Sequence, residues 1–129
     1  MPKQGRNRGQ ISAENQTALA ASQIAIGAGW GADSTVAIGT GSNDVAGKLT
    51  ISTVVGAGAM AQATATVVIT YASAYASAPR ACIATSTNTN SLGTAPVWLW
   101  SSTTTALTLT CPLLPVTAKD YVINYALIA

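Results

Sequence analysis

The side chains that could carry out chemistry in this chain are few and widely spaced. The 129 residues include no histidine, which excludes the Ser-His-Asp and Cys-His arrangements of nucleophilic catalysis and the common zinc sites. A glycosidase needs two carboxylates held on either side of one bond at a fixed separation, and the spacing of the acidic residues predicts no such pair. Those residues are Glu14, Asp33, Asp44 and Asp120. We therefore expect that the protein is not an enzyme.

Two motifs that resemble binding sites are better explained by backbone geometry. Asp44 lies in the sequence GSNDVAG, but a calcium loop needs several oxygen ligands with carboxylates at set positions, whereas Asn, Asp and Gly are typical of turns. The glycine-rich stretches 27–31 and 56–58 are not followed by Lys-Ser/Thr and are not phosphate loops. We expect no metal and no cofactor.

The two cysteines, Cys82 and Cys111, lie in segments expected to be strands that could be neighbours. This placement is compatible with a single disulfide. Since the sequence shows no export signal, we favour two reduced cysteines that pack as small hydrophobic residues in the core, and the disulfide stays open.

A short stretch, 97–101, combines two tryptophans with apolar residues on both faces. Trp98 and Trp100 would point to one side of a strand, with Val97 and Leu99 on the other. In one interpretation one tryptophan fills the core and the other lies under a loop. In the other, which we favour, Trp98 and Trp100 belong to a subunit interface, where tryptophan is enriched.

Half of the six basic residues fall in the first eight positions, as Lys3, Arg6 and Arg8. This low-hydrophobicity segment predicts an extended arm that docks on a protein surface, folding as it binds, or else remains a solvated tail. The net charge of +2 is too small to indicate nucleic acid or a membrane surface. After the arm, residues 12–22 could form a short helix; alternatively, 23–26 begins a strand.

The rest of the chain predicts strands, organised around residues 63–71. There Ala65, Val67, Ile69 and Tyr71 alternate with threonines and Val68, which gives one apolar and one threonine-rich face. Turn residues separate the other expected strands, which are 34–40, 48–53, 80–87, 97–101, 106–111 and 120–128. The pattern predicts an all-β, antiparallel sandwich or jelly roll over residues 31–129, preceded by an arm over 1–30.

Charge is unusually scarce. Only 8% of residues are Asp, Glu, Lys or Arg, against about 25% in ordinary soluble domains. Residues 49–79 and 81–118 contain none, yet no run approaches the roughly 18–20 apolar residues of a spanning helix. A secreted or thermostable domain with a Ser/Thr coat would fit, but we favour a protein whose faces are covered by copies of itself or by a larger assembly.

The sequence GTGSNDVAGKLTIST, followed by ATATVVITYASAYASAPRACIA, resembles small β-sandwich modules of tailed-bacteriophage virion proteins. The resemblance covers residues 35–129. It implies a module without catalytic residues, commonly a homotrimer, that serves as a capsid decoration (cement) protein or as a fibre tip.

About 30 residues precede the module, which suits a docking arm better than a fibre stalk. We therefore expect a trimeric decoration protein that binds the major capsid protein on the outer surface of the head after assembly in the host cytoplasm. The alternative is a receptor-binding fibre tip that contacts host glycans through residues such as Asn88, Asn90 and Trp98. A third possibility is an unrelated secreted adhesion domain.

Overall fold

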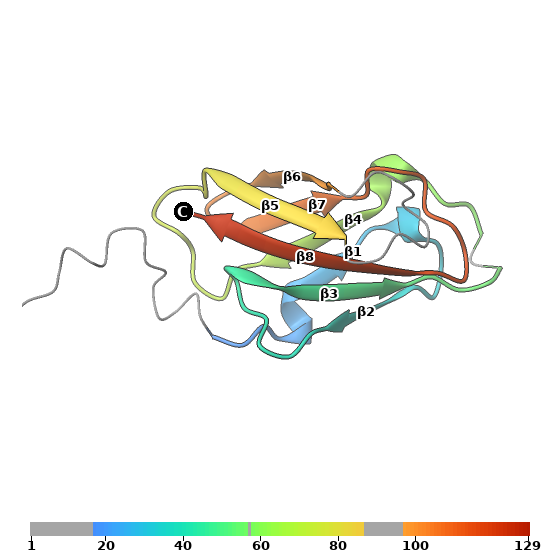
Figure 1. The fold of residues 1–129 in the computed structure, drawn as a ribbon, viewed down its shortest axis with the longest axis horizontal. Helices are drawn as coiled ribbons and strands as arrows, with labels where there is room; N and C mark the ends of the chain where they lie inside the picture. Colours follow the sequence, from blue (N-terminus) through green and yellow to red (C-terminus); the bar gives the residue numbers. More distant parts are fainter. Residues whose placement is uncertain (1–16, 57, 87–96) are drawn as a thin grey trace, which may run out of the picture.

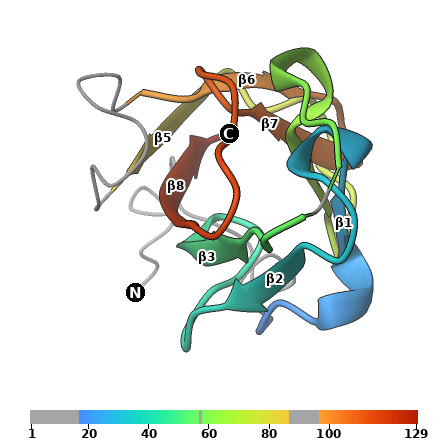
Figure 2. The ribbon, with the colours of Figure 1, turned by 90° about the vertical axis from the view of Figure 1, so that its right-hand side faces the viewer.

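The computed structural model describes residues 17–56, 58–86 and 97–129. These residues form two four-stranded antiparallel sheets that pack against each other (Figure 1). Seen along the strands, the sheets curve around a common interior (Figure 2). No α-helix occurs in the described ranges, where the helical elements are short 3₁₀ turns. The predicted all-β antiparallel sandwich is confirmed.

Each sheet takes strands from distant parts of the chain. The first sheet has the order β1 (Ile24–Ile26), β4 (Thr66–Thr70), β7 (Ala106–Thr110) and β6 (Leu99–Ser102). The second has the order β2 (Thr35–Ile38), β3 (Ala46–Ser52), β8 (Asp120–Ile128) and β5 (Ala81–Ser86). The 3₁₀ turns are η3 (Ala21–Gln23), η4 (Ala28–Trp30) and η5 (Gln62–Thr64).

The strand predicted over 63–71 is confirmed as an inner strand, β4, which is flanked by β1 and β7. Val67 and Ile69 are fully buried, as their alternation with threonine predicts. The strand starts later than expected because residues 62–64 form the turn η5, in which Ala65 N–H donates to Gln62 O at 3.2 Å. Ala63 is consequently exposed.

The longest ladder joins β3 to β8 over seven residue pairs. Its inward pairs include Leu49 with Ile123 and Ile51 with Tyr121, and all four side chains are buried. The alternation predicted for 120–128 is therefore confirmed, and this ladder supplies one wall of the core.

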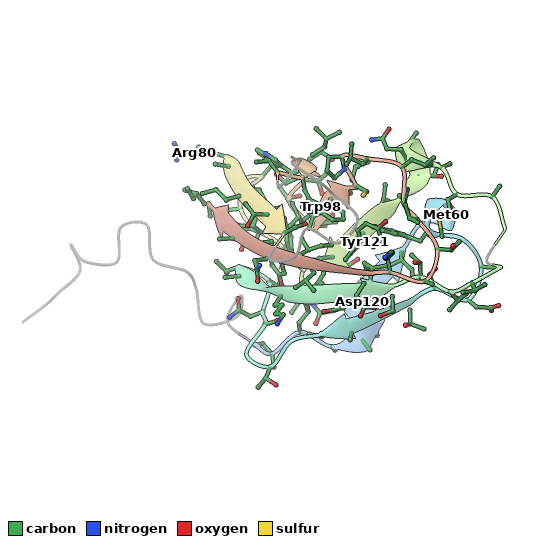
Figure 3. All side chains as sticks on the ribbon, turned by 45° about the vertical axis from the view of Figure 1, so that its right-hand side comes forward. Met60, Arg80, Trp98, Asp120 and Tyr121 are labelled. Carbon is green, nitrogen blue, oxygen red and sulfur yellow. The ribbon has the colours of Figure 1, made fainter. Side chains whose placement is uncertain are left out.

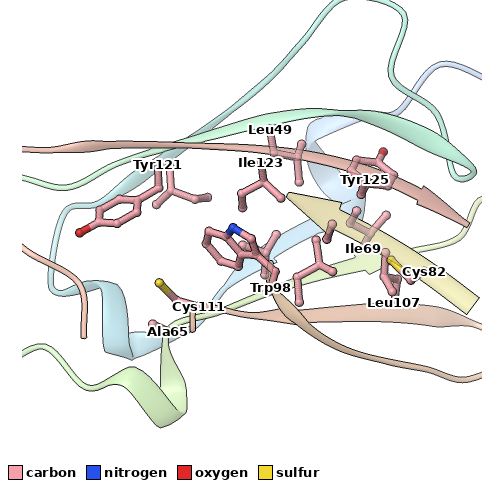
Figure 4. Packing of buried hydrophobic residues seen from close by; sticks show 14 of the residues in the cluster. Leu49, Ala65, Ile69, Cys82, Trp98, Leu107, Cys111, Tyr121, Ile123 and Tyr125 are labelled. Carbon is pink, nitrogen blue, oxygen red and sulfur yellow. The ribbon is translucent and has the colours of Figure 1, made fainter. Parts of the chain in front are cut away.

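The core is filled by aromatic and branched side chains from both sheets (Figure 4). Trp30 and Trp98 stack with ring centroids 5.9 Å apart, and Tyr121 lies 5.2 Å from Trp30. All three are at most 1% exposed. Such offset aromatic contacts add roughly 0.5–1.5 kcal/mol beyond the burial of their area.

The helix predicted over 12–22 is not an α-helix in its described part. Ala18 forms a bridge with Asn43, and Leu19 enters the core. Tertiary packing of Leu19 outweighs the helix propensity of a short segment. The alternative, a strand from residue 23, is confirmed by β1. Since β1 and the buried Trp30 precede residue 31, the sandwich begins earlier than the predicted boundary.

The turns η4 and η5 meet backbone to backbone. A Cβ atom at Gly29 would lie 2.1 Å from Ala61 O and 2.3 Å from Ala65 N. A Cβ at Gly27 would lie 2.2 Å from Thr64 O. Only glycine permits this approach, which holds the segment carrying Trp30 against the start of β4.

Candidate subunit interface

The residues predicted to contact partners fall into three different environments. Lys3, Arg6 and Arg8, the predicted docking arm, lie outside the described residues. Trp98 is buried between the sheets (Figure 3), whereas Trp100 is 39% exposed. The two tryptophans therefore do not form one surface.

Trp98 belongs to the core of its own chain. Its indole stacks on Trp30, and its Nε1 donates a hydrogen bond to Ser86 Oγ at 2.9 Å. With 1% of its surface exposed, its ring has no face left for a second subunit in this fold. The interpretation in which one tryptophan fills the core describes Trp98, and Trp100 is the one that remains accessible to a partner.

The difference arises because the segment 97–102 passes from one sheet to the other. Val97 forms a bridge with Thr85 beside β5, and two residues later Leu99 pairs with Thr110 of β7. Trp100 pairs with Leu109, whose side chain is buried, so Trp100 also faces inward. Since β6 is an edge strand, its tryptophan is only partly covered.

Large apolar side chains are exposed on this side of the sandwich, which we call the open flank. Ile83 pairs with Ala126 and Ile128 with Ala81, so both isoleucines are on the outer face of the second sheet. The other exposed apolar residues are Val97 and those of the first half of β6. The open flank consists of Ile83 (61% exposed), Val97 (63%), Leu99 (57%), Trp100 (39%) and Ile128 (57%).

The backbone joins the two sheets at the open flank through the residues that precede β6. Trp98 N–H donates to Ala84 O at 2.9 Å, so Ala84 directs its backbone groups away from β8. The direction of the backbone N–H and C=O groups alternates from one residue to the next along a strand, so the backbone groups of Cys82, two residues before Ala84, also point away from β8. Within the described residues, no backbone hydrogen bond from Cys82 crosses the flank. Among the described residues, the segment 97–98 is therefore joined to β5 near Ala84 and Thr85, and no such bond is found near Cys82.

The opposite side, between β1 and β2, is closed by hydrogen bonds, and we call it the closed flank. Asp44 is fully buried there. Its Oδ1 accepts from Gln23 Nε2 at 3.0 Å, and its Oδ2 accepts from Ala72 N–H at 2.6 Å. Gln23 Nε2 also donates to Thr70 O at 2.8 Å, and Leu19 N–H donates to Ser42 O at 2.9 Å.

The sequence predicted only a turn role for this region. Asn43 meets that expectation, since its Oδ1 accepts from the backbone N–H groups of Val45 and Ala46. Asp44 instead reaches across to the other sheet, which local pattern could not indicate. The one sequence feature that could have indicated this contact is Gln23, a polar residue next to the strand expected from residue 23, which is able to donate a hydrogen bond to the Asp44 carboxylate.

Tyrosines surround Asp44. The hydroxyl of Tyr125 donates to Asn43 O at 2.5 Å, whereas the buried hydroxyls of Tyr71 and Tyr75 have no hydrogen-bond partner among the described residues. The rings of Tyr71 and Tyr75 meet edge to face at 4.8 Å. Burial, followed by the charge of Asp44, raises the pKa of Tyr125, and burial also raises the pKa of Tyr71 and Tyr75. All three hydroxyls stay protonated at neutral pH.

The cysteines are free and buried, as favoured, but their strands are not neighbours. Cys82 lies on β5, which pairs with β8, while Cys111 follows β7 in the other sheet. Burial raises the pKa of the Cys82 thiol to about 11 and also raises that of Cys111. Both thiols are therefore protonated, and neither is an activated nucleophile.

The described ranges contain neither a cluster of metal ligands nor a helix that could span a membrane. No group of three or more His, Cys, Asp or Glu side chains there is placed to hold a metal ion. Nor does this part of the chain contain a helix with the length and apolar character needed to cross a membrane.

Comparison with known proteins gives no relative: no protein-family model, no curated protein and no solved structure matches this chain. The surfaces described above are thus the basis on which a function can be proposed.

Proposed function

We propose that this protein is a non-enzymatic structural subunit of a tailed-phage particle, a homotrimeric decoration (cement) protein on the outer surface of the head. The observation that carries the proposal is a sandwich surface almost without charge. Six charged side chains occur in the described ranges, and one of them, Asp44, is buried. The remaining five are Asp33, Lys48, Arg80, Lys119 and Asp120.

Such a surface favours association. Charge of one sign keeps protein molecules apart in solution, and a net charge of +2 on a chain of this size supplies little repulsion. Exposed apolar side chains on the open flank add an attraction between molecules. A subunit whose surface is covered by its neighbours in an assembly does not need surface charge to remain in solution.

The basic arm is the proposed contact with the major capsid protein. Lys3, Arg6 and Arg8 would dock on acidic or carbonyl-rich surfaces of the shell. The chain that follows the arm is fixed to the sandwich, because Ala18 bridges Asn43 in the turn before β3. Binding of the arm would therefore hold the whole sandwich against the shell.

The alternative, a glycan-binding fibre tip, has less support from the residues expected to make the contacts. Trp98 is buried, and Asn88 and Asn90 lie outside the described residues. Among the described tryptophans, Trp100 is the one that is partly exposed to solvent.

Copy number per particle tests the proposal. Purified heads that lack the protein are incubated with the full chain, and bound copies are counted by quantitative mass spectrometry and electron microscopy. Hundreds of copies spread over the head are expected. A handful of copies at the tail would support the fibre tip, and no binding to any particle would contradict both.

Variants of the arm sharpen the test. Lys3→Gln, Arg6→Gln and Arg8→Gln combined should abolish head binding, because the docking charges are lost while the sandwich is untouched. The matched control is Lys119→Gln, which removes one exposed charge near β8 and should bind heads normally. If the triple variant still saturates heads, the arm does not provide the contact.

A further inference from the structure

We propose that the end of the sandwich from which the arm leaves faces the capsid shell, and that Lys48 and Arg80 extend the contact of the arm there. We call this end the arm end. The inference rests on the proposed function and deepens it, because it orients the sandwich and adds two contact residues on the folded domain. It is carried by the way in which the exposed charges divide between the two ends of the second sheet.

The arm leaves the sandwich beside Lys48. Leu19 N–H donates to Ser42 O at 2.9 Å, which fixes the beginning of the described chain against the turn before β3. Ser42 Oγ in turn accepts from Lys48 N–H at 3.0 Å. The side chain of Lys48 is exposed on the outer face of the second sheet, since its neighbour Leu49 points into the core. Lys48 is thus the charged residue of the sheet next to the start of the arm.

Arg80 lies at the same end, on the other side of β8. Ala46 of β3 and Ile83 of β5 both pair with Ala126, and both strands run antiparallel to β8. The residues that precede β3 and β5 therefore lie together where β8 finishes. Arg80 N–H donates to Ile128 O at 2.9 Å, and the exposed side chain projects from this end (Figure 3). By strand spacing and rise, Lys48 and Arg80 are roughly 15 Å apart, close enough to meet one protein surface.

The exposed acidic side chains lie at the opposite end, which we call the far end. Asp120 begins β8 and pairs with Ser52, which pairs in turn with Thr35, two residues after Asp33. Asp33, Lys119 and Asp120 are all exposed. Figure 3 shows Asp120 well separated from Arg80. The nine residues of β8 span about 27 Å, well beyond the Debye length of about 8 Å at physiological ionic strength. The acids of the far end therefore do not neutralise the arm end.

The exposed side-chain charge of the arm end is basic. Asp44, the acidic residue described there, is fully buried and is hydrogen-bonded to Gln23 Nε2 and to Ala72 N–H. Lys48 and Arg80 consequently have no acidic partner among the described residues. Residues 1–16 add three basic side chains and one acidic one. A protein surface rich in Asp and Glu is the partner that complements this end, and such complementarity fixes the orientation in which two proteins dock.

Amine footprinting of the full chain tests the orientation. The three lysines of the chain are Lys3, Lys48 and Lys119. The protein, free and bound to heads at the same concentration, is treated with an acetylating reagent, and the modified lysines are quantified by mass spectrometry. Lys48 should react about fivefold or more slowly on heads, because a docked surface excludes water and reagent. Lys119, at the far end, is the internal control and should react at the rate of the free protein.

Charge variants give a second measurement. Lys48→Gln and Arg80→Gln should each weaken head binding by about two- to fivefold at low salt, and the loss should disappear at high salt, where exposed charges are screened. Both side chains are exposed, so circular dichroism should show the wild-type fold. Lys119→Gln removes the same charge at the far end and should bind as the wild type does. If all three variants bind alike, the inference is wrong.

The same assay separates this failure from failure of the proposed function. Heads covered by protein in which Lys48 stays as reactive as in free solution would overturn the orientation and leave the decoration role standing. Protection of Lys119 in place of Lys48 would reverse the orientation and likewise contradict the inference. A wild type that does not sediment with heads at any salt concentration would overturn the decoration role, and the inference with it.

Discussion

The two flanks of the sandwich differ in how their edge strands are covered. Where two sheets meet, each leaves an edge strand whose backbone groups and inner side chains need cover. On the closed flank the chain supplies that cover, through Asp44, Gln23 and the backbone of Leu19. On the open flank, one backbone hydrogen bond among the described residues, from Trp98 N–H to Ala84 O, joins the sheets, and apolar side chains are exposed. The contrast shows that the chain covers one flank with polar contacts of its own, whereas apolar side chains stay exposed on the other.

Replacing the two tryptophans separates folding from association most strongly. Trp98→Ala should lower the free energy of unfolding by about 4 kcal/mol, because it leaves a large core cavity beside Trp30. Trp100→Ala should cost only about 1 kcal/mol, since its ring is partly exposed, but it should abolish trimer formation. Urea denaturation and sedimentation equilibrium measure the two effects. Equal loss of stability in both variants would contradict the distinction.

Asp44→Asn tests whether the closed flank depends on its carboxylate. An amide of the same shape presents a donor to either Gln23 Nε2 or Ala72 N–H, so one of two hydrogen bonds is lost and a buried donor is left unpaired. We expect a loss of about 2–3 kcal/mol in the free energy of unfolding. Asp33→Asn is the control: Asp33 is exposed, and asparagine tolerates its positive φ of 61°. A neutral Asp44→Asn would show that the flank is closed by packing alone.

Alkaline pH should destabilise the core between the flanks through groups that are buried in their neutral form. Cys82, a core residue on β5, has its pKa raised from 9.0 to about 11 by burial. Its contribution is fully present below pH 9 and is lost as pH rises towards 11, because the unfolded thiol ionises first. Tyr71 and Tyr125 act in the same direction above pH 10.

The urea midpoint should therefore fall steadily above pH 9. Cys82→Ala should make the fall between pH 9 and 11 less steep, because Cys111 is then the one buried thiol in the described residues that still contributes, while leaving the later loss from the tyrosines in place. A midpoint that rises between pH 9 and 11 would contradict the assignment.

The smallest expected effect compares two tyrosines of the Asp44 network. Tyr71→Phe removes a buried hydroxyl without a partner and should stabilise the protein by about 1 kcal/mol. Tyr125→Phe removes the hydrogen bond to Asn43 O and should destabilise it by about the same amount. Thermal denaturation of the two variants gives the signs, and a destabilised Tyr71→Phe would mean that its hydroxyl has a partner.

Sequence reasoning succeeded where a pattern is local. The alternation around Val67 and Ile69 correctly predicted an inner strand and its buried face, and the same holds for residues 120–128. It failed where the outcome depends on distant segments. The helix predicted before residue 22 gave way to a bridge with Asn43, and Cys82 and Cys111 proved to lie in different sheets.

For the same reason, the sequence could not place the two tryptophans of the candidate interface. The composition of 97–101 indicated a surface of interest, and Trp100 is indeed accessible. Nothing in the stretch itself distinguishes Trp98 from Trp100, since both face inward. Their difference depends on Trp30, which fills the space beside Trp98 from a position 68 residues earlier in the chain.

The backbone contact between η4 and η5 constrains which residues homologous sequences can carry at two positions. Even alanine at Gly29 would collide with Ala61 O, so any divergent homologue that retains this corner must retain glycine there, and at Gly27 as well. A search profile weighted on this pair, the tryptophan one residue after Gly29 and the strand that begins at Thr66 could recognise distant kin whose remaining positions have drifted beyond detection.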